Sequence, residues 1–108
     1  MTILRSSTDF ENFVKDDEEE IRIVICTAEW SRVCRNLNQN LTYLREKYQK
    51  IDFATIDVDK CSKVKKDHSV ASVPTWLIFK NQKLRKEIST TNECIVDREI
   101  KQIVSSNS

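Results

Sequence analysis

The sequence predicts an α/β fold in which a central mixed sheet carries helices on both faces. Strand-like and helix-like patterns alternate along the chain in the order βαβαβαββα, which is typical of strands joined by helical crossovers. Residues 21–27 are apolar at nearly every position, as expected of a strand that is buried on both sides. These two observations place that strand in the middle of the sheet.

The first elements predicted are a short strand, residues 2–5, and a helix. Thr8 and Glu11 have the spacing of a capping box, which marks the start of a helix. The apolar stripe of this helix consists of Phe10, Phe13 and Val14. It ends near an acidic run, residues 16–20, which we expect to be a solvated helix end and loop.

After the central strand, apolar residues recur at helical spacing across residues 33–48, which predicts one helix there. This stripe consists of Leu37, Leu41, Leu44 and Tyr48. Residues 51–58 are predicted to form the next strand, and residues 61–67 a short helix.

A hairpin and a helix complete the predicted fold. Residues 76–79 and 83–89 form the hairpin, and because the chain has no glycine, Asn81 is the best candidate for its tight turn. Thr90 and Glu93 form a second candidate capping box before the last helix. The stripe of that helix consists of Val96, Ile100, Ile103 and Val104.

Length and charge restrict the function classes. The 108 residues, 39% of them apolar and 32% charged, suit a single domain spanning residues 1–108. A net charge of +1 gives no electrostatic basis for binding nucleic acid or an anionic membrane, so neither is expected as a partner. No apolar segment approaches the about 20 residues of a spanning helix, and the first residues lack a signal-peptide pattern. We expect a soluble intracellular protein of the cytoplasm, with the nucleus as the alternative.

The four cysteines do not have the spacing of a zinc site, and only one histidine, His68, accompanies them. We expect no metal and no cofactor, and free thiols rather than disulfides. Cys26 lies in the apolar strand and is predicted to fill the core. Cys61 and Cys94 fall at predicted helix starts, where we expect them to be exposed, with His68 on the surface.

The segment Ser31-Arg32-Val33-Cys34 has the layout of a dithiol redox site in which serine replaces the first cysteine. It follows the central strand and Trp30, and the only proline, Pro74, comes forty residues later. A dithiol reductase needs a nucleophilic thiol and a second thiol that resolves the mixed disulfide. A serine hydroxyl does neither, so the segment predicts a changed or lost reaction.

The chain resembles the thioredoxin family, most closely its eukaryotic cytosolic members. The resemblance covers nearly the whole chain without a gap and rests on Ala28-Glu29-Trp30, Glu46-Lys47-Tyr48, Ile56-Asp57-Val58-Asp59-Lys60-Cys61 and Val73-Pro74-Thr75. It implies the thioredoxin fold, and it implies a cis peptide bond before Pro74, beside residues 31–34.

The departures from the family pattern fall on positions that the resemblance assigns to chemistry. The family's W-C-G-P-C motif would place a cysteine where Ser31 stands. Its buried aspartate falls on Ile25, and the charged residue on the neighbouring strand falls on Thr55. Its hairpin glycine falls on Gln82, and the glycine beside the active site falls on Thr90. The joint loss of thiol, acid and glycine favours loss of dithiol turnover.

We therefore expect a redox-inactive or weakly active module that binds a protein or peptide in a groove beside Pro74. An exposed Trp30 would anchor the partner, and the backbone of Val73 would pair with an extended segment. The candidate binding residues are Trp30, Arg32, Val33, Val73, Pro74 and Thr90.

Two alternatives remain from the sequence. In the first, the protein is a single-thiol oxidoreductase: Ser31 donates a hydrogen bond to the Cys34 thiolate, and Cys34 forms mixed disulfides with a protein or with glutathione. Against it, burial of Cys34 would raise the pKa of the thiol and leave it inert. In the second, Ser31 is an engineered replacement in an ordinary thioredoxin, which leaves Ile25, Arg32 and Thr90 unexplained.

Overall fold

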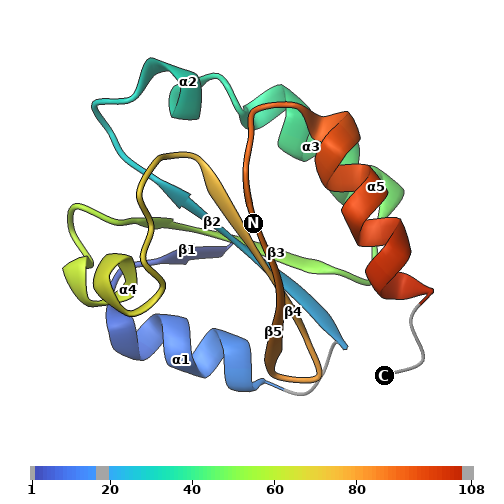
Figure 1. Ribbon diagram of the computed structural model, residues 1–108, viewed down its shortest axis with the longest axis horizontal. Coiled ribbons are helices and arrows are strands. Elements are labelled where there is room, and N and C mark those ends of the chain that lie inside the picture. The colour runs from blue at the N-terminus through green and yellow to red at the C-terminus, as the bar shows by residue number, and fades with distance from the viewer. Residues whose placement is uncertain (1, 17–19, 106–108) are drawn as a thin grey trace.

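The computed structural model describes residues 2–16 and 20–105, which form one five-stranded sheet with helices on both faces (Figure 1). The elements are β1 (Thr2–Leu4), α1 (Ser7–Lys15), β2 (Ile21–Thr27), α2 (Arg32–Arg35), α3 (Asn38–Lys47), β3 (Asp52–Asp57), α4 (Ser62–Asp67), β4 (Thr75–Lys80), β5 (Lys83–Ser89) and α5 (Glu93–Val104). The α/β class is confirmed, and the order of elements is as predicted except that two helices, α2 and α3, stand where one was predicted.

The sheet has the strand order β1-β3-β2-β4-β5 and is mixed, as predicted. β3 runs parallel to both β1 and β2, whereas β4 runs antiparallel to β2 and β5. Helices α3 and α5 cover one face, and α1 and α4 cover the other (Figure 1). No helix in the described part of the chain is both long and apolar enough to cross a membrane.

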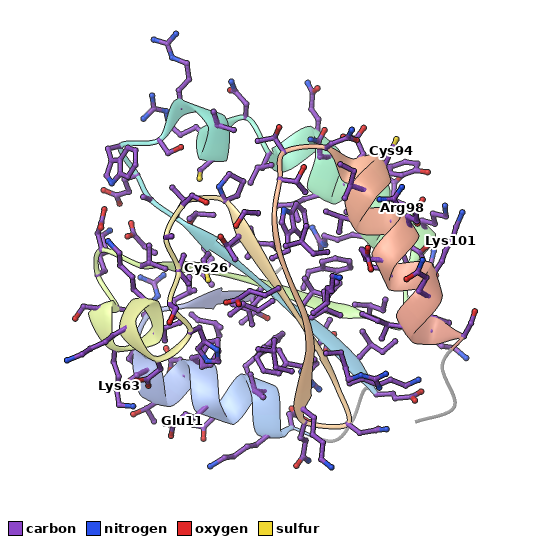
Figure 2. All side chains as sticks on the ribbon, viewed as in Figure 1. Glu11, Cys26, Lys63, Cys94, Arg98 and Lys101 are labelled. Atoms are coloured by element: carbon purple, nitrogen blue, oxygen red, sulfur yellow. The ribbon has the colours of Figure 1, made fainter. Side chains whose placement is uncertain are left out.

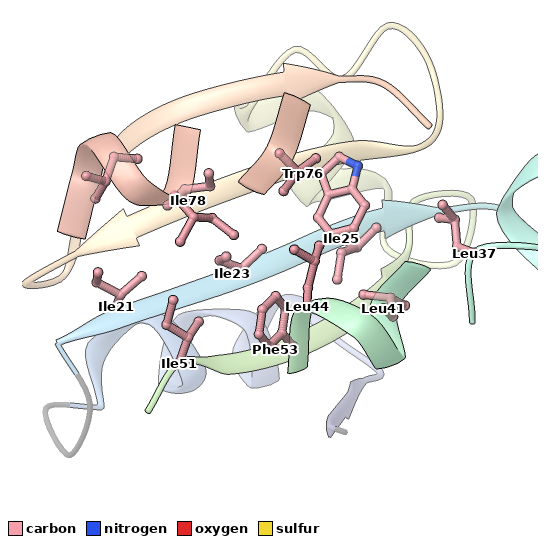
Figure 3. Packing of buried hydrophobic residues seen from close by; sticks show 13 residues of the cluster. Ile21, Ile23, Ile25, Leu37, Leu41, Leu44, Ile51, Phe53, Trp76 and Ile78 are labelled. Atoms are coloured by element: carbon pink, nitrogen blue, oxygen red, sulfur yellow. The ribbon is translucent and has the colours of Figure 1, made fainter. Parts of the chain in front are cut away.

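β2 is buried on both faces because its side chains alternate between two apolar clusters. Ile23 and Ile25 pack with α3 and α5, while Val24 and Cys26 pack with α1 and α4. Figure 3 shows the first of these clusters along the length of β2. The apolar run at residues 21–27 therefore predicted the centre of the sheet correctly.

The prediction of one helix across residues 33–48 is wrong. α2 ends at Arg35, and the Asn36 amide bonds to the carbonyl oxygens of both Arg32 and Val33 at 3.2 Å. The Leu37 amide then donates to the Cys34 carbonyl at 3.3 Å, three residues back. This tight turn separates α2 from α3 yet keeps Leu37 in the core, so the apolar spacing continues across the break.

Neither predicted capping box caps a helix. Ser6 caps α1 by accepting a hydrogen bond from the amide three residues on at 3.1 Å, so this helix begins before the 8–11 pair. Asn92 caps α5 by accepting from the Cys94 amide at 2.9 Å, which leaves Thr90 outside the helix and Glu93 as its first residue.

Cys61 and His68 are less exposed than the sequence suggested. Cys61 is buried against the cluster formed with α1 and α4, and burial raises the pKa of its thiol, as do the nearby charges of Asp57 and Asp9. His68 is half-buried, with its ring centroid 5.3 Å from that of Phe10. The prediction for Cys61 is wrong because α4 packs on the sheet beside α1 and encloses its thiol, whereas His68 stays partly exposed at the end of α4.

Of the acidic run, residues 17–19 lie outside the described residues. Its two ends are ion-paired with buried cations rather than simply solvated. Asp16 lies 3.2 Å from the Arg22 guanidinium, and Glu20 lies 3.6 Å from the Lys80 ammonium. Arg22 also pairs with Asp52 at 2.9 Å, so both acidic ends help to compensate cations that the sheet buries.

The last helix buries a carboxylate that the sequence did not predict. Asp97 is 7% exposed and accepts hydrogen bonds from Lys47 at 2.5 Å and from the Tyr48 hydroxyl. Val104, in contrast, was predicted to be buried and is 50% exposed. α5 therefore turns Asp97 toward α3 and leaves its last apolar residue at the surface.

The hairpin turn lies where the absence of glycine suggested. Asn81 and Gln82 have φ angles of 52° and 70°, the left-handed pair typical of a two-residue hairpin loop. Asparagine tolerates this conformation, whereas glutamine pays a steric cost for its Cβ. The turn therefore stores strain at Gln82.

Gln82→Gly is expected to raise the free energy of unfolding by about 0.5–1 kcal/mol, because glycine adopts positive φ freely. The substitution also removes a hydrogen bond from the Gln82 side chain to the Lys15 carbonyl. Gln82→Ala, which removes the same bond and keeps Cβ, is the matched control. Urea denaturation measures both variants, and a Gly variant no more stable than the Ala variant would contradict the prediction.

Candidate functional site

Sheet register brings the predicted binding segments to one end of the molecule. Cys26 on β2 is paired with Thr75 on β4, and Thr75 is paired with Ser89 on β5, where the two hydroxyl oxygens are 2.9 Å apart. Three segments therefore lie at the same end of the strands (Figure 1). They are the segment after β2, Pro74 before β4 and Thr90 after β5. Residues far apart in sequence form one surface here.

Trp30 is the largest exposed apolar side chain at this end, with 71% of its surface accessible. Its indole N–H donates to the Asp59 carboxylate at 2.6 Å, which fixes the ring orientation. Beside it, Glu29 pairs with Lys60 at 2.5 Å. Val33 adds a second exposed apolar side chain. The loop after β2 thus presents an apolar surface that the loop after β3 holds in place.

Sequence reasoning did not identify Asp59, Glu29 or Lys60 as part of this surface. A signal was available, because Asp59 and Lys60 follow a strand that runs parallel to β2. The carboxyl ends of adjacent parallel strands meet at one edge of a sheet, so the two following loops are neighbours.

Ser31 caps α2 through its side chain. Its hydroxyl oxygen accepts a hydrogen bond from the Cys34 amide at 3.3 Å, and its own amide donates to the Ala28 carbonyl at 3.1 Å. Within the described residues, no hydrogen bond joins the Ser31 hydroxyl to Cys34 Sγ. The Ser31–Cys34 side-chain bond that the single-thiol alternative requires is therefore not among the contacts of the described residues, where the Ser31 oxygen accepts from the backbone instead.

Cys34 is a free thiol, 9% exposed, and is one of the residues that line a cavity of about 300 Å³. The cavity lies between the α2–α3 segment and strands β1 and β3, and its lining includes Ile3, Leu37, Leu41 and Thr55. Ile25 pairs in register with Thr55. The two positions that the family resemblance associated with charge thus carry uncharged side chains, and the charged residues of the lining are Glu29, Arg35 and Asp57.

Pro74 is buried and follows a cis peptide bond from the half-buried Val73. Within the described part of the chain, no hydrogen bond engages the backbone N–H or C=O of Val73. Thr90 lies nearby and is occupied internally: its carbonyl accepts from the Trp76 indole at 2.9 Å, and its hydroxyl accepts from the Asn92 amide at 3.1 Å. Val73 therefore offers backbone groups, whereas Thr90 offers mainly its methyl group.

The other thiols differ in their access to solvent (Figure 2). Cys26 is fully buried in β2, and burial, together with the charge of Glu87, raises the pKa of its thiol to about 12. Cys94 is exposed in the first turn of α5, as expected. The described residues contain no group of three side chains suited to hold a metal ion.

The strand order and the helices on both faces define a protein of the thioredoxin fold. The X-ray structure of Fasciola hepatica thioredoxin superposes with a TM-score of 0.86 at 25% sequence identity, covering 94% of this chain and 98% of that one. The expected thioredoxin fold is confirmed.

The thioredoxin family model matches residues 1–106, so the chain belongs to the thioredoxin family. Human thioredoxin is 27% identical over 101 residues, which are 94% of this chain and 96% of the human protein. Mitochondrial thioredoxin-3 of Saccharomyces cerevisiae is 26% identical over 103 residues, which are 95% of this chain and 80% of the yeast protein. Because it belongs to this family, the protein is a redox protein of the thioredoxin class.

Proposed function

We propose that this protein is a redox-inactive or weakly active thioredoxin-like module that binds an extended segment of another protein. The observation that carries the proposal is the state of Ser31. Its hydroxyl is buried and engaged as the cap of α2, three residues before Cys34. A serine cannot form a disulfide with Cys34, so the nucleophile of dithiol exchange is missing from this site.

The proposed partner lies across Pro74. The unengaged backbone groups of Val73 are suited to pair with an extended main chain, as in strand addition. Trp30 and Val33 supply an exposed apolar anchor at the same end of the sheet, and exposed aromatic side chains are typical binding anchors. The site thus combines main-chain hydrogen bonding with one aromatic contact.

A negative group on the partner fits best near Arg32. In the described part of the chain Arg32 forms no ion pair, while the neighbouring carboxylates of Glu29 and Asp59 are engaged by Lys60 and Trp30. The N–H groups of α2 are not assigned to this anion, because α2 has four residues and Ser31 occupies the Cys34 amide. Any preference for an acidic partner therefore depends on the arginine side chain.

A second candidate function, single-thiol exchange at Cys34, is favoured by one observation. Cys34 is among the residues that line the cavity of about 300 Å³ beside β1 and β3. A small thiol compound such as glutathione could enter there without displacing Trp30. In this alternative Cys34 forms a mixed disulfide by exchange with glutathione disulfide, which releases one reduced glutathione.

Capture of partners from cell extract separates the two functions. For a binding module, Trp30→Ala should weaken capture by about 2 kcal/mol, a factor of roughly 30, and Arg32→Glu should weaken it about fivefold. Cys34→Ser should leave capture unchanged, with or without reductant. Tyr43→Ala, which removes an exposed ring from α3, is the matched control and should have no effect. Immunoblotting or quantitative mass spectrometry of the retained proteins gives the measurement.

The opposite pattern would overturn the proposal. If Cys34→Ser abolishes capture while circular dichroism shows an intact fold, or if capture occurs only without reductant, the interaction is covalent. The single-thiol function would then replace the binding module. We propose that the protein acts in the cytoplasm, with the nucleus as the alternative. The extract should therefore be prepared from the cytoplasm.

A further inference from the structure

A second cavity, of about 370 Å³, lies far from Trp30, at the opposite end of β2. It is formed where α3 and α5 end and where β2 begins, and Ile51, just before β3, contributes to its lining. Seven residues of extended strand separate this end of β2 from the other, which corresponds to roughly 20 Å. The cavity is therefore independent of the proposed peptide surface, and its volume lies within the range of small-molecule sites.

The floor of this cavity is apolar. Ile21 and Ile51 lie at the same end of the core and line it from the sheet side (Figure 3). Val104 lines it from the end of α5, which explains a half-exposed apolar side chain at a position that helical spacing assigns to the core. The Tyr48 hydroxyl is bonded to Asp97, so the ring serves as apolar wall.

Three charged side chains lie at the rim of the cavity, and two of them are already ion-paired. Lys47 is paired with Asp97 at 2.5 Å, and Glu20 lies 3.6 Å from Lys80. Lys50 is exposed and, in the described part of the chain, has no ion-pair partner. A ligand that enters the cavity thus meets apolar side chains below and one available ammonium group at the edge.

We propose that this cavity binds a small carboxylic acid with an aromatic or aliphatic tail. The tail lies on Ile21, Ile51 and Val104, and the carboxylate pairs with the Lys50 ammonium. Apolar burial supplies most of the affinity, and the ion pair at the exposed rim selects an anion over a neutral analogue. This site is separate from thiol chemistry and from peptide binding.

Nuclear magnetic resonance titration of the ¹⁵N-labelled protein tests the proposal, with 4-phenylbutyrate as the probe and 4-phenylbutan-1-ol as its neutral analogue. The carboxylate is expected to shift the amide signals of Ile21, Ile51 and Val104 and to leave that of Trp30 unchanged. The alcohol is expected to bind at least threefold more weakly. If the signals do not shift at millimolar probe, or if both compounds bind equally, the proposal is wrong.

Three variants locate the site. Val104→Asp, a change at a half-exposed position, should abolish the shifts by placing a polar, negative side chain on the floor. Lys50→Gln should weaken binding of the carboxylate about threefold to fivefold and leave the alcohol unaffected. Lys65→Gln, at an exposed position on α4, is the matched control and should bind as the parent protein does. Binding that persists unchanged in Val104→Asp would overturn the assignment.

Discussion

Asp97→Asn is expected to lower the free energy of unfolding by about 2–3 kcal/mol at neutral pH. The Asp97 side chain is 10% exposed and joins α5 to two residues of the α3 end, Lys47 and Tyr48. The amide keeps the shape but loses the charge, so two donors lose their ionised acceptor in a partly desolvated site. The expected loss of stability is smaller than for a fully buried ion pair because the Lys47 side chain is one-third exposed.

Urea denaturation measures this effect, and Asp67→Asn is the matched control. Asp67 pairs with Lys63 four residues earlier on the surface of α4, where solvent screens the interaction. The control should have the same urea midpoint as the parent protein. If the two variants are equally stable, the Asp97 cluster does not join the helices as described.

The same cluster predicts an acid dependence of stability. Burial favours the neutral form of Asp97, but the hydrogen bonds from Lys47 and Tyr48 outweigh burial and hold the pKa of the carboxyl below its ordinary value of 3.8. A lowered pKa in the folded state stabilises the protein above the unfolded pKa, and this contribution is lost as the pH falls through the folded pKa. The stability difference between the parent and Asp97→Asn should therefore shrink below about pH 4.

The parent protein is expected not to catalyse the reduction of insulin by dithiothreitol, and Ser31→Cys is expected to restore only a weak activity. The new cysteine can form a disulfide with Cys34, because the two positions are one helical turn apart at the start of α2. No carboxylate lies at position 25 to accept a proton, and Arg32 and Val33 remain between the thiols. We expect turnover at least tenfold below that of human thioredoxin, or about 1.4 kcal/mol in the barrier.

Adding Ile25→Asp to Ser31→Cys should raise the turnover at neutral pH and lower the stability. Ile25 is fully buried between Thr55 and Trp76 in the sheet, and neither residue carries a positive charge to compensate a carboxylate. An unpaired buried carboxylate is expected to cost several kcal/mol and to have a raised pKa. Ile25→Val, which costs about 1 kcal/mol and adds no proton acceptor, is the control and should not raise turnover. Full activity in Ser31→Cys alone would show that the other changes do not limit the reaction.

Much of the fold was predictable because its signals are local. The apolar run at residues 21–27, the alternation of strand and helix patterns, and Asn81 as the turn residue each depend on a few neighbours in sequence. The structure places all three as predicted. The helix boundaries were less predictable because a cap depends on backbone direction. Ser6 and Asn92 have the extended backbone that a cap requires, whereas Thr8 lies inside α1 and Thr90 lies two residues before the cap of α5.

The site was predictable in part. The sequence identified the segment at residues 30–34 and the proline loop, because their residue types are unusual in themselves. It did not identify Asp59 as the acceptor for Trp30, nor the cap role of Ser31. The first contact joins residues 29 apart in the chain, and the second depends on where α2 begins.

The sequence by itself determined the α/β class, the central strand and the absence of a second cysteine three residues before Cys34. Only the tertiary structure decided which side chains are covered: Cys61 is buried, Val104 is exposed, and Asp97 is buried with its charge. Residues 47 and 97 are 50 positions apart, and no local sequence pattern indicates that α3 and α5 bring them together. Burial and pairing of this kind arise from packing between distant elements, whereas periodicity reports only which face of each element is apolar.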